Sequence, residues 1–96
     1  METKNRILVV DDEQDLCEIL KFNLETEGYE VDTANSAEEV LEIGAEKYDL
    51  LLLDVMMGAM SGFALAKKLK DEPMTANIPI IFLTAKDTEN DTVTGF

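Results

Sequence analysis

Four consecutive leucines, Leu50 to Leu53, constrain the fold of this chain more than any other feature. They stand between Asp49 and Asp54. An apolar run this short, bounded by charge, is typical of a strand buried on both faces of a parallel sheet. Asp54 would then lie at the carboxyl end of that strand, where open α/β sheets bind ligands. An aspartate in this place can also simply begin a turn.

Three further runs indicate strands. Residues 6–10 form a compact β-branched run. Residues 29–33 alternate, with tyrosine, valine and threonine on one side of the strand and two acidic residues on the other. The polar side of that second run favours a place at a sheet edge. Residues 78–83 form the fourth run, with Pro79 near its start, where a missing N–H is tolerated.

Between these strands, apolar residues recur at helical spacing. The predicted helices cover residues 14–27, 37 to about 47, and roughly 62–71. Gly28 suits the end of the first helix, and Ser36 with Glu39 forms a capping-box pattern at the start of the second. This alternation of strands and helices predicts right-handed crossovers and a parallel sheet.

The first helix carries a wide apolar stripe, made of Leu16, Ile19, Leu20 and Leu24 and broadened by Cys17 and Phe22. Because Cys17 lies in this apolar pattern, it is expected to be a small core residue. It is the only cysteine, so an internal disulfide is excluded. A chain with a single cysteine and no internal disulfide fits a reducing compartment. With no signal peptide apparent and no run of transmembrane length, the predicted location is cytoplasmic, without a membrane partner.

Composition narrows the function. The 96 residues suit one domain, and 21 acidic against 8 basic residues give a net charge of −13. This charge argues against direct binding of nucleic acid or of an anionic membrane. The chain has no histidine, which removes histidine-based acid–base catalysis and most zinc sites.

Polar residues follow three of the predicted strands: Asp11 and Asp12 after the first, Asp54 after the third and Thr84 after the fourth. Parallel strands end at one shared edge, so neighbouring strands would bring the three carboxylates together. Such a cluster repels itself unless a cation neutralises it, and carboxylates without histidine or thiolate ligands favour Mg²⁺. A carboxylate beside Mg²⁺ is a candidate nucleophile toward phosphorus, and the Thr84 hydroxyl is a candidate donor to a phosphoryl oxygen.

Four motifs carry a family resemblance: Val-Val-Asp-Asp-Glu at 9–13, Leu-Leu-Leu-Asp-Val-Met-Met at 51–57, Met-Ser-Gly-Phe at 60–63 and Leu-Thr-Ala-Lys at 83–86. In order and spacing, over nearly the whole chain, they resemble a response-regulator receiver domain of bacterial two-component signalling. Other phosphate sites are excluded, because the chain has no G-x-x-x-x-G-K-[ST] loop, no G-x-G-x-x-G and no EF-hand pattern.

The resemblance implies a flavodoxin-like, doubly wound parallel sheet in the order 2-1-3-4-5. It implies that Asp54 accepts a phosphoryl group from the phosphohistidine of a sensor kinase. Mg²⁺ would be held by Asp12, more directly, and Asp11, joined by Asp54 and the backbone carbonyl of Met56. Thr84 would be the switch hydroxyl, and Ala85 the small residue that leaves it room.

Two departures from the family pattern stand out. Gly58 replaces the proline that usually follows Met-Met, which should loosen the loop after Asp54 without removing a ligand. The family also continues past Phe96 with a fifth strand, which ends in a phosphoryl-binding lysine, and a fifth helix. Residues 1–96 are therefore expected to form a receiver domain that is incomplete at its carboxyl terminus. A chain that truly ended there is expected to be partly unfolded or to associate through strand four, which would be an exposed edge.

The expected function is a Mg²⁺-dependent phospho-acceptor switch that is not an enzyme beyond self-catalysed phosphorylation and dephosphorylation. One alternative is a non-catalytic, truncated receiver that serves as a protein-interaction module, which the missing lysine supports. A second is a Mg²⁺-dependent phosphohydrolase. Its nucleophile would follow the first strand in an Asp-x-Asp pattern, and Asp11-Asp12-Glu13 lacks that spacing.

Overall fold

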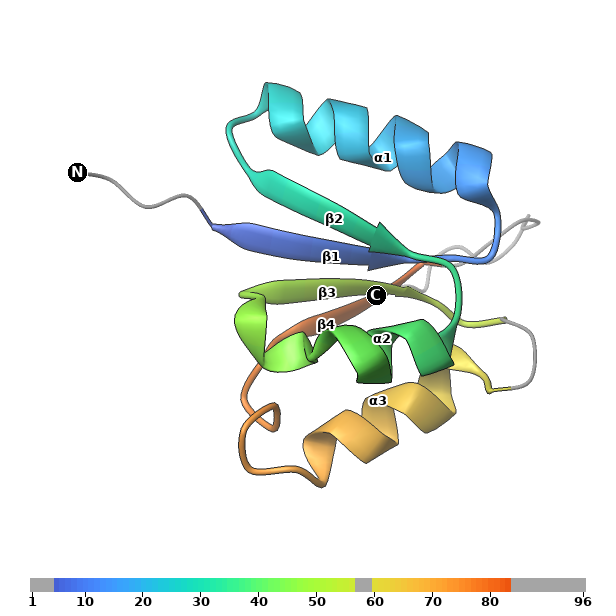
Figure 1. Cartoon of the computed structure of the whole chain (residues 1–96), viewed down its shortest axis with the longest axis vertical. Helices are drawn as coiled ribbons and strands as arrows, with labels where there is room; N and C mark the ends of the chain where they lie inside the picture. Colours follow the sequence, from blue (N-terminus) through green and yellow to red (C-terminus); the bar gives the residue numbers. More distant parts are fainter. Residues whose placement is uncertain (1–4, 57–59, 84–96) are drawn as a thin grey trace.

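The computed structural model describes residues 5–56 and 60–83, which contain four strands, three α-helices and one short 3₁₀ helix (Figure 1). In chain order these are β1 (Arg6–Val10), α1 (Gln14–Thr26), β2 (Glu30–Ala34), α2 (Ala37–Ile43), η1 (Ala45–Lys47), β3 (Leu50–Asp54), α3 (Gly62–Lys70) and β4 (Ile80–Leu83). The predicted alternation of strands and helices is confirmed. No helix in these two ranges is long and apolar enough to cross a membrane.

The strands form one parallel sheet in the order β2-β1-β3-β4, which confirms the predicted fold for the described part of the chain. Figure 1 shows α1 on one face of this sheet and α2 and α3 on the other. Val10 lies opposite both Ala34 and Leu53 in the strand register. The carboxyl ends of β2, β1 and β3 are therefore level, which brings the residues that follow them to one edge of the sheet.

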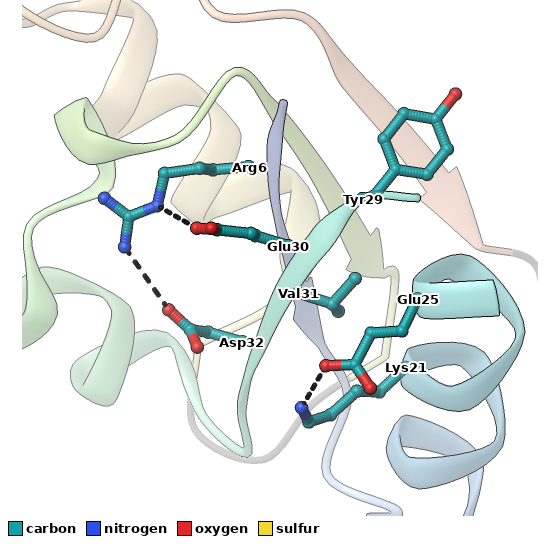
Figure 2. A pocket seen from close by; sticks show the side chains of 7 residues that line it. All are labelled: Arg6, Lys21, Glu25, Tyr29, Glu30, Val31 and Asp32. Carbon is teal, nitrogen blue, oxygen red and sulfur yellow. Dashed lines mark hydrogen bonds and ion pairs between the residues drawn. The ribbon is translucent and has the colours of Figure 1, made fainter. Parts of the chain in front are cut away.

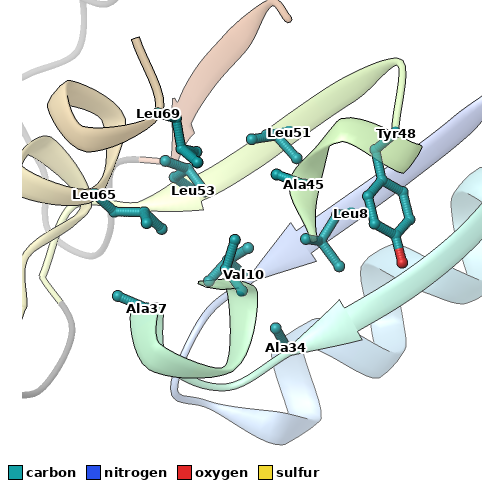
Figure 3. Close-up of a cluster of buried hydrophobic side chains, with 11 residues drawn as sticks. Leu8, Val10, Ala34, Ala37, Ala45, Tyr48, Leu51, Leu53, Leu65 and Leu69 are labelled. Carbon is teal, nitrogen blue, oxygen red and sulfur yellow. The ribbon is translucent and has the colours of Figure 1, made fainter. Parts of the chain in front are cut away.

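Hydrophobic side chains pack on both faces of the sheet, and the period of two along each strand divides them. Leu8, Val10, Leu51 and Leu53 belong to the cluster under α2 and α3 (Figure 3). The cluster under α1 consists of Ile7, Val9, Cys17, Val31 and Leu52, with Leu20, Leu24, Leu50 and Leu83 packed against it. The leucine run of β3 is thus buried on both faces, as its sequence predicts.

On α1, the apolar stripe divides between the core and the surface. Cys17 is buried, and Leu20 and Leu24 are partly buried against the sheet. Ile19 and Phe22 lie on the outer side of the helix, where 57% and 70% of their surface is exposed. The stripe is therefore wider than the face that packs on the sheet, because side chains two and five positions after Cys17 point away from the face that it occupies.

The ends of α1 and α2 depend on two glycines with positive φ. Gly28, at φ +102°, follows α1 and donates its N–H to the carbonyl of Glu25, while Tyr29 donates to Leu24, which is a Schellman motif. Gly44, at φ +94°, ends α2 at Ile43. The predicted extension of this helix to about Lys47 is therefore wrong, and residues 45–47 form η1 instead.

The start of α2 confirms Ser36 as its N-cap, since the hydroxyl accepts the N–H of Glu39 at 3.1 Å. The Glu39 carboxylate accepts the N–H of Asn35 at 2.9 Å. A capping box would have it accept from Ser36 itself, so the reciprocal bond is displaced by one residue toward β2.

The fourth strand begins at Ile80, two residues later than predicted. The N–H of Ile78 is bonded to the carbonyl of Thr75 in a turn, and Lys70 donates to the carbonyls of Ala76 and Ile78 at 3.1 Å each. These bonds hold residues 76–78 against α3, so bonding to β3 starts only at Pro79, whose carbonyl accepts the N–H of Leu51 at 3.1 Å. In the described ranges β4 is an outermost strand, and 49% of the surface of Ile81 is exposed. Association of copies through this edge stays a prediction.

Paired charges line the opposite edge of the sheet, at β2. A hollow of about 360 Å³ lies there, lined by Arg6, Lys21, Glu25, Tyr29, Glu30, Val31 and Asp32 (Figure 2). Arg6 Nε lies 3.7 Å from Glu30 Oε1, and Lys21 Nζ lies 2.6 Å from Glu25 Oε2. Exposed pairs of this kind contribute less than about 1 kcal/mol each. Charged side chains beside an edge strand nevertheless disfavour pairing with a strand of another chain.

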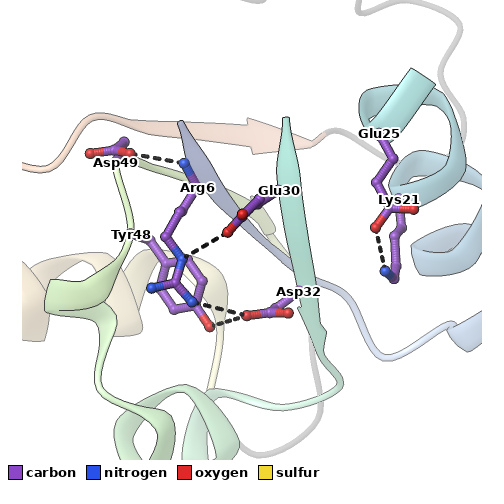
Figure 4. A network of polar contacts seen from close by, with 7 residues as sticks. All are labelled: Arg6, Lys21, Glu25, Glu30, Asp32, Tyr48 and Asp49. Atoms are coloured by element: carbon purple, nitrogen blue, oxygen red, sulfur yellow. Dashed lines mark hydrogen bonds and ion pairs between the residues drawn. The ribbon is translucent and has the colours of Figure 1, made fainter. Parts of the chain in front are cut away.

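Tyr48 connects the core to this charged edge (Figure 4). Its ring is buried under the guanidinium of Arg6, whose Cζ lies 5.3 Å from the ring centroid. Its hydroxyl donates to Asp32 Oδ2 at 2.7 Å. Burial first, and then the hydrogen bond to the Asp32 carboxylate, raise the pKa of Tyr48 from 10.0 to about 12. The folded protein therefore holds the phenolic proton more tightly than the unfolded chain does.

We expect Tyr48→Phe to be less stable than the wild type by about 2 kcal/mol between pH 7 and 9, because it lacks the hydrogen bond to a carboxylate. The stabilisation from the raised pKa is fully present below pH 10 and is lost as the pH rises from 10 to 12. The difference between the two proteins should accordingly narrow by about 1 kcal/mol between pH 9 and pH 11 in urea unfolding. Tyr29→Phe is the matched control, and an equal difference at both pH values would contradict the assignment.

Candidate metal centre

Asp11, Asp12 and Asp54 form a compact acidic cluster at the carboxyl edge of the sheet. Each offers a carboxylate oxygen, and these oxygens all lie within 4.8 Å of one another. Asp54 is the last residue of β3, and Asp11 and Asp12 directly follow β1, which is paired with β3 up to Val10 and Leu53. The predicted meeting of the three carboxylates is confirmed.

Two members of the cluster are buried. Asp11 and Asp54 are 3% and 5% exposed, whereas Asp12 is exposed. Burial raises the pKa of Asp11, and the charges of Asp12 and Glu13 raise it further. The N–H of Glu13, which donates to Asp11 Oδ1 at 2.9 Å, acts in the opposite direction. The site thus concentrates negative charge where water is largely excluded.

This donor set fits a hard divalent cation. Three carboxylate oxygens, with no imidazole, suit Mg²⁺, which commonly binds to a few carboxylates and keeps water or phosphate oxygens as its other ligands. A cation at this point would remove the repulsion within the cluster. Met56, the fourth predicted ligand, lies two residues after Asp54 with its side chain exposed. Thr84, Ala85 and Gly58 lie outside the described residues.

Sequence patterns did not point to two residues that support the cluster. Asn35, directly after β2, donates from Nδ2 to the backbone carbonyl of Asp11 at 3.0 Å. Cys17 donates from Sγ to the same oxygen at 3.3 Å. Burial, and then the charge of Asp11, raise the pKa of the Cys17 thiol to about 11, so the thiol keeps its proton at neutral pH. Asn35 could have been identified from its position directly after a strand, because that places it at the same edge of the sheet as Asp11.

Gly62 lets the first turn of α3 approach the end of β3. Its N–H donates to the carbonyl of Val55 at 2.9 Å. A Cβ at this position would collide with the backbone carbonyl oxygen of Asp54. Ser61 caps the helix by accepting the N–H of Ala64 at 3.1 Å. The backbone of Asp54 is therefore held between strand pairing on one side and α3 on the other.

Asp11→Asn should raise the free energy of unfolding by about 1 kcal/mol when Mg²⁺ is chelated, because it removes a buried charge from a repulsive cluster. The new amide oxygen can still accept the N–H of Glu13. Urea unfolding in EDTA measures this difference, and the same change at an exposed carboxylate, Asp71→Asn, should have an effect within about 0.5 kcal/mol of zero. A loss of stability in Asp11→Asn would show that the cluster is not repulsive.

Gly62→Ala should destabilise the protein by at least about 2 kcal/mol, although alanine favours helices over glycine by about 1 kcal/mol. The cause is the collision with Asp54, which forces α3 or the end of β3 to move. Gly28→Ala is the matched control in the same urea unfolding series. No heavy atom lies within 4 Å of its added Cβ, so only the cost of its positive φ is expected, about 1 kcal/mol. Wild-type stability in Gly62→Ala would contradict the close approach.

The family model and the similar curated proteins all point to response regulators. Residues 7–96 match the response regulator receiver domain family. The chain is 42% identical over 87 residues to the response regulator SaeR of Staphylococcus epidermidis. This alignment covers 91% of this chain and 37% of SaeR. It is 45% identical over 91 residues to the alkaline phosphatase synthesis transcriptional regulatory protein PhoP of Bacillus subtilis, which covers 94% of this chain and 37% of that protein. The chain thus spans little more than a third of the length of these curated relatives.

Solved structures agree with the sequence matches. The N-terminal domain of a response regulator receiver protein from Methanoculleus marisnigri superposes with a TM-score of 0.82 at 40% identity, which covers 92% of this chain and 72% of that one. The chemotaxis protein CheY4 of Vibrio cholerae superposes with a TM-score of 0.81 at 31% identity. The superposition covers 90% of this chain and 72% of the CheY4 chain. By sequence and by fold, this chain belongs to the response regulator receiver domain family of two-component signalling.

Proposed function

We propose that this chain is a phospho-acceptor switch, in which Asp54 takes a phosphoryl group from the phosphohistidine of a sensor kinase in a Mg²⁺-dependent reaction. The observation that carries the proposal is the meeting of Asp11, Asp12 and Asp54 within 4.8 Å at the carboxyl edge of a receiver-type sheet. Family membership supports the signalling role, and the geometry supports the assignment of the three residues.

The surroundings of the three carboxylates favour Asp54 as the acceptor. Asp54 ends a buried strand, lies opposite Leu83 in the register and has α3 against its backbone at Gly62. A fixed backbone favours the in-line approach that phosphoryl transfer needs. Asp11 and Asp12 follow a different strand, β1, and Asp12 is exposed there, so we propose both as metal ligands.

In the proposed reaction, an oxygen of Asp54 attacks phosphorus while the bond from phosphorus to the histidine nitrogen breaks. The products are an aspartyl phosphate and a histidine that regains its ring lone pair. Mg²⁺, when bound by Asp11, Asp12, Asp54 and the backbone carbonyl of Met56, would neutralise charge on the phosphoryl oxygens. Thr84 is proposed as the hydroxyl that donates to the phosphoryl group. Attack of water on phosphorus then breaks the bond to the Asp54 oxygen, which releases inorganic phosphate and restores the carboxylate.

The proposed partners follow from the same chemistry. The donor is a sensor histidine kinase, and the net charge of −13 favours a docking surface with basic residues over nucleic acid. A reducing, cytoplasmic location accords with a single cysteine, which is buried. We propose that residues 1–96 form a receiver domain that lacks the carboxyl-terminal part of the family pattern.

The test is direct phosphorylation with a small donor. Incubation of the protein with Mg²⁺ and acetyl phosphate, followed by borohydride reduction and mass spectrometry, should place the modification on Asp54 alone. EDTA should abolish it, because the attacking and transferred groups are both negatively charged. Asp54→Asn should take up no label, whereas the matched change at the other end of the same run, Asp49→Asn, should label like the wild type.

Label on another aspartate, or label that persists in Asp54→Asn, would contradict the assignment of the acceptor. A folded wild type that takes up no label with Mg²⁺ present would favour the alternative function, a module that binds partners without phosphoryl transfer.

A further inference from the structure

Asn35 reaches from the end of β2 into the acidic cluster. Its Nδ2 lies 3.0 Å from the backbone carbonyl oxygen of Asp11 and 3.9 Å from the sulfur of Cys17. A carbonyl oxygen can only accept hydrogen bonds, so the amide must present its NH₂ group here. The Cys17 thiol donates to the same oxygen at 3.3 Å, so two donors hold this one carbonyl.

The carbonyl that Asn35 holds belongs to the peptide group between Asp11 and Asp12. A peptide group is planar, so fixing its oxygen also fixes the nitrogen and Cα of Asp12. The N–H of Asp11 is bonded to the carbonyl of Ala34 at 3.1 Å, and its side chain accepts from Glu13 at 2.9 Å. Asp12 is exposed, and the peptide group that precedes it sets where its side chain starts.

Asn35 is itself held in place from α2. Its backbone N–H donates to the carboxylate of Glu39 at 2.9 Å, and Glu39 is tied to Ser36 by the helix cap. The amide therefore projects from a fixed backbone and acts on the turn after β1 from the neighbouring strand end. Asn35 lies outside both hydrophobic clusters, so its side chain can be shortened without opening a cavity in the core.

We infer that Asn35 is a positioning residue for the metal centre: its amide orients the peptide group between Asp11 and Asp12, so that the Asp12 carboxylate faces Asp54 despite the repulsion between them. The inference rests on the proposed function, because it assigns a role to a residue that supports Mg²⁺ binding. Without the amide, repulsion within the cluster turns the exposed Asp12 toward solvent, and a cation must restore that geometry when it binds.

The test is a Mg²⁺ titration of the full chain by calorimetry. Asn35→Ala should bind Mg²⁺ about ten-fold more weakly than the wild type, the usual size for loss of a residue that orients a metal ligand. Asn23→Ala, the same change at an exposed position on α1, should keep the wild-type affinity. Thermal unfolding checks that each variant is folded at the titration temperature, because a residue with a merely structural role lowers the melting temperature of a folded protein without changing its affinity.

A double-mutant cycle with Asp12→Asn identifies the residue through which Asn35 acts. Asp12→Asn alone should weaken binding, and adding Asn35→Ala should then cost at most about two-fold, because the positioned charge is already gone. An unchanged affinity in Asn35→Ala, or an equal ten-fold loss in both backgrounds, would overturn the inference and leave the proposed function intact. Absence of Mg²⁺ binding by the folded wild type would instead overturn the proposed function, and the inference with it.

Discussion

Parallel pairing of β1 with β3 is the constraint on which the site depends. It places Val10 opposite Leu53, so Asp54 at the end of β3 lies beside the residues that follow β1. Two like charges 4.8 Å apart repel by about 3 kcal/mol at the effective dielectric constant of a protein surface. Burying a side chain such as Leu51 or Leu53 stabilises by roughly 2 kcal/mol. The cluster is tolerated because many such burials, on both faces of the sheet, hold the strands in register.

The structure supports its three carboxylates unequally. Asp54 is fixed by strand pairing and by the close approach of Gly62. Asp11 is fixed through its N–H, its carbonyl and its side chain. Asp12 is the exposed member of the three. In the proposed reaction, this difference would keep Asp54 still while the groups around it adjust.

The parts of this picture that sequence predicts are those set by local pattern and by topology. Leu50 to Leu53 identify a strand buried on both faces, and alternation with helices makes the sheet parallel. Asp11, Asp12 and Asp54 then meet if β1 and β3 are neighbours, and that order was implied by the family resemblance. The end of α2 at Ile43 escaped prediction, because an apolar pattern continues through Gly44 while the backbone there turns to positive φ. The contact of Asn35 escaped it as well. An asparagine after a strand suits any turn, and only the level ends of β2 and β1 place its amide against one particular carbonyl.

The buried thiol of Cys17 provides a way to measure local opening of the structure beside the acidic cluster. Its thiol is 1% exposed, protonated at neutral pH and bonded to the carbonyl of Asp11, so a thiol-alkylating reagent cannot reach it in the closed structure. Access requires the first turns of α1 to separate from the strand ends. The rate of alkylation relative to that of an open thiol would therefore report the free energy of that separation. Because the chain has no second cysteine, this reading comes from one place in the molecule, a single hydrogen bond away from the acidic cluster.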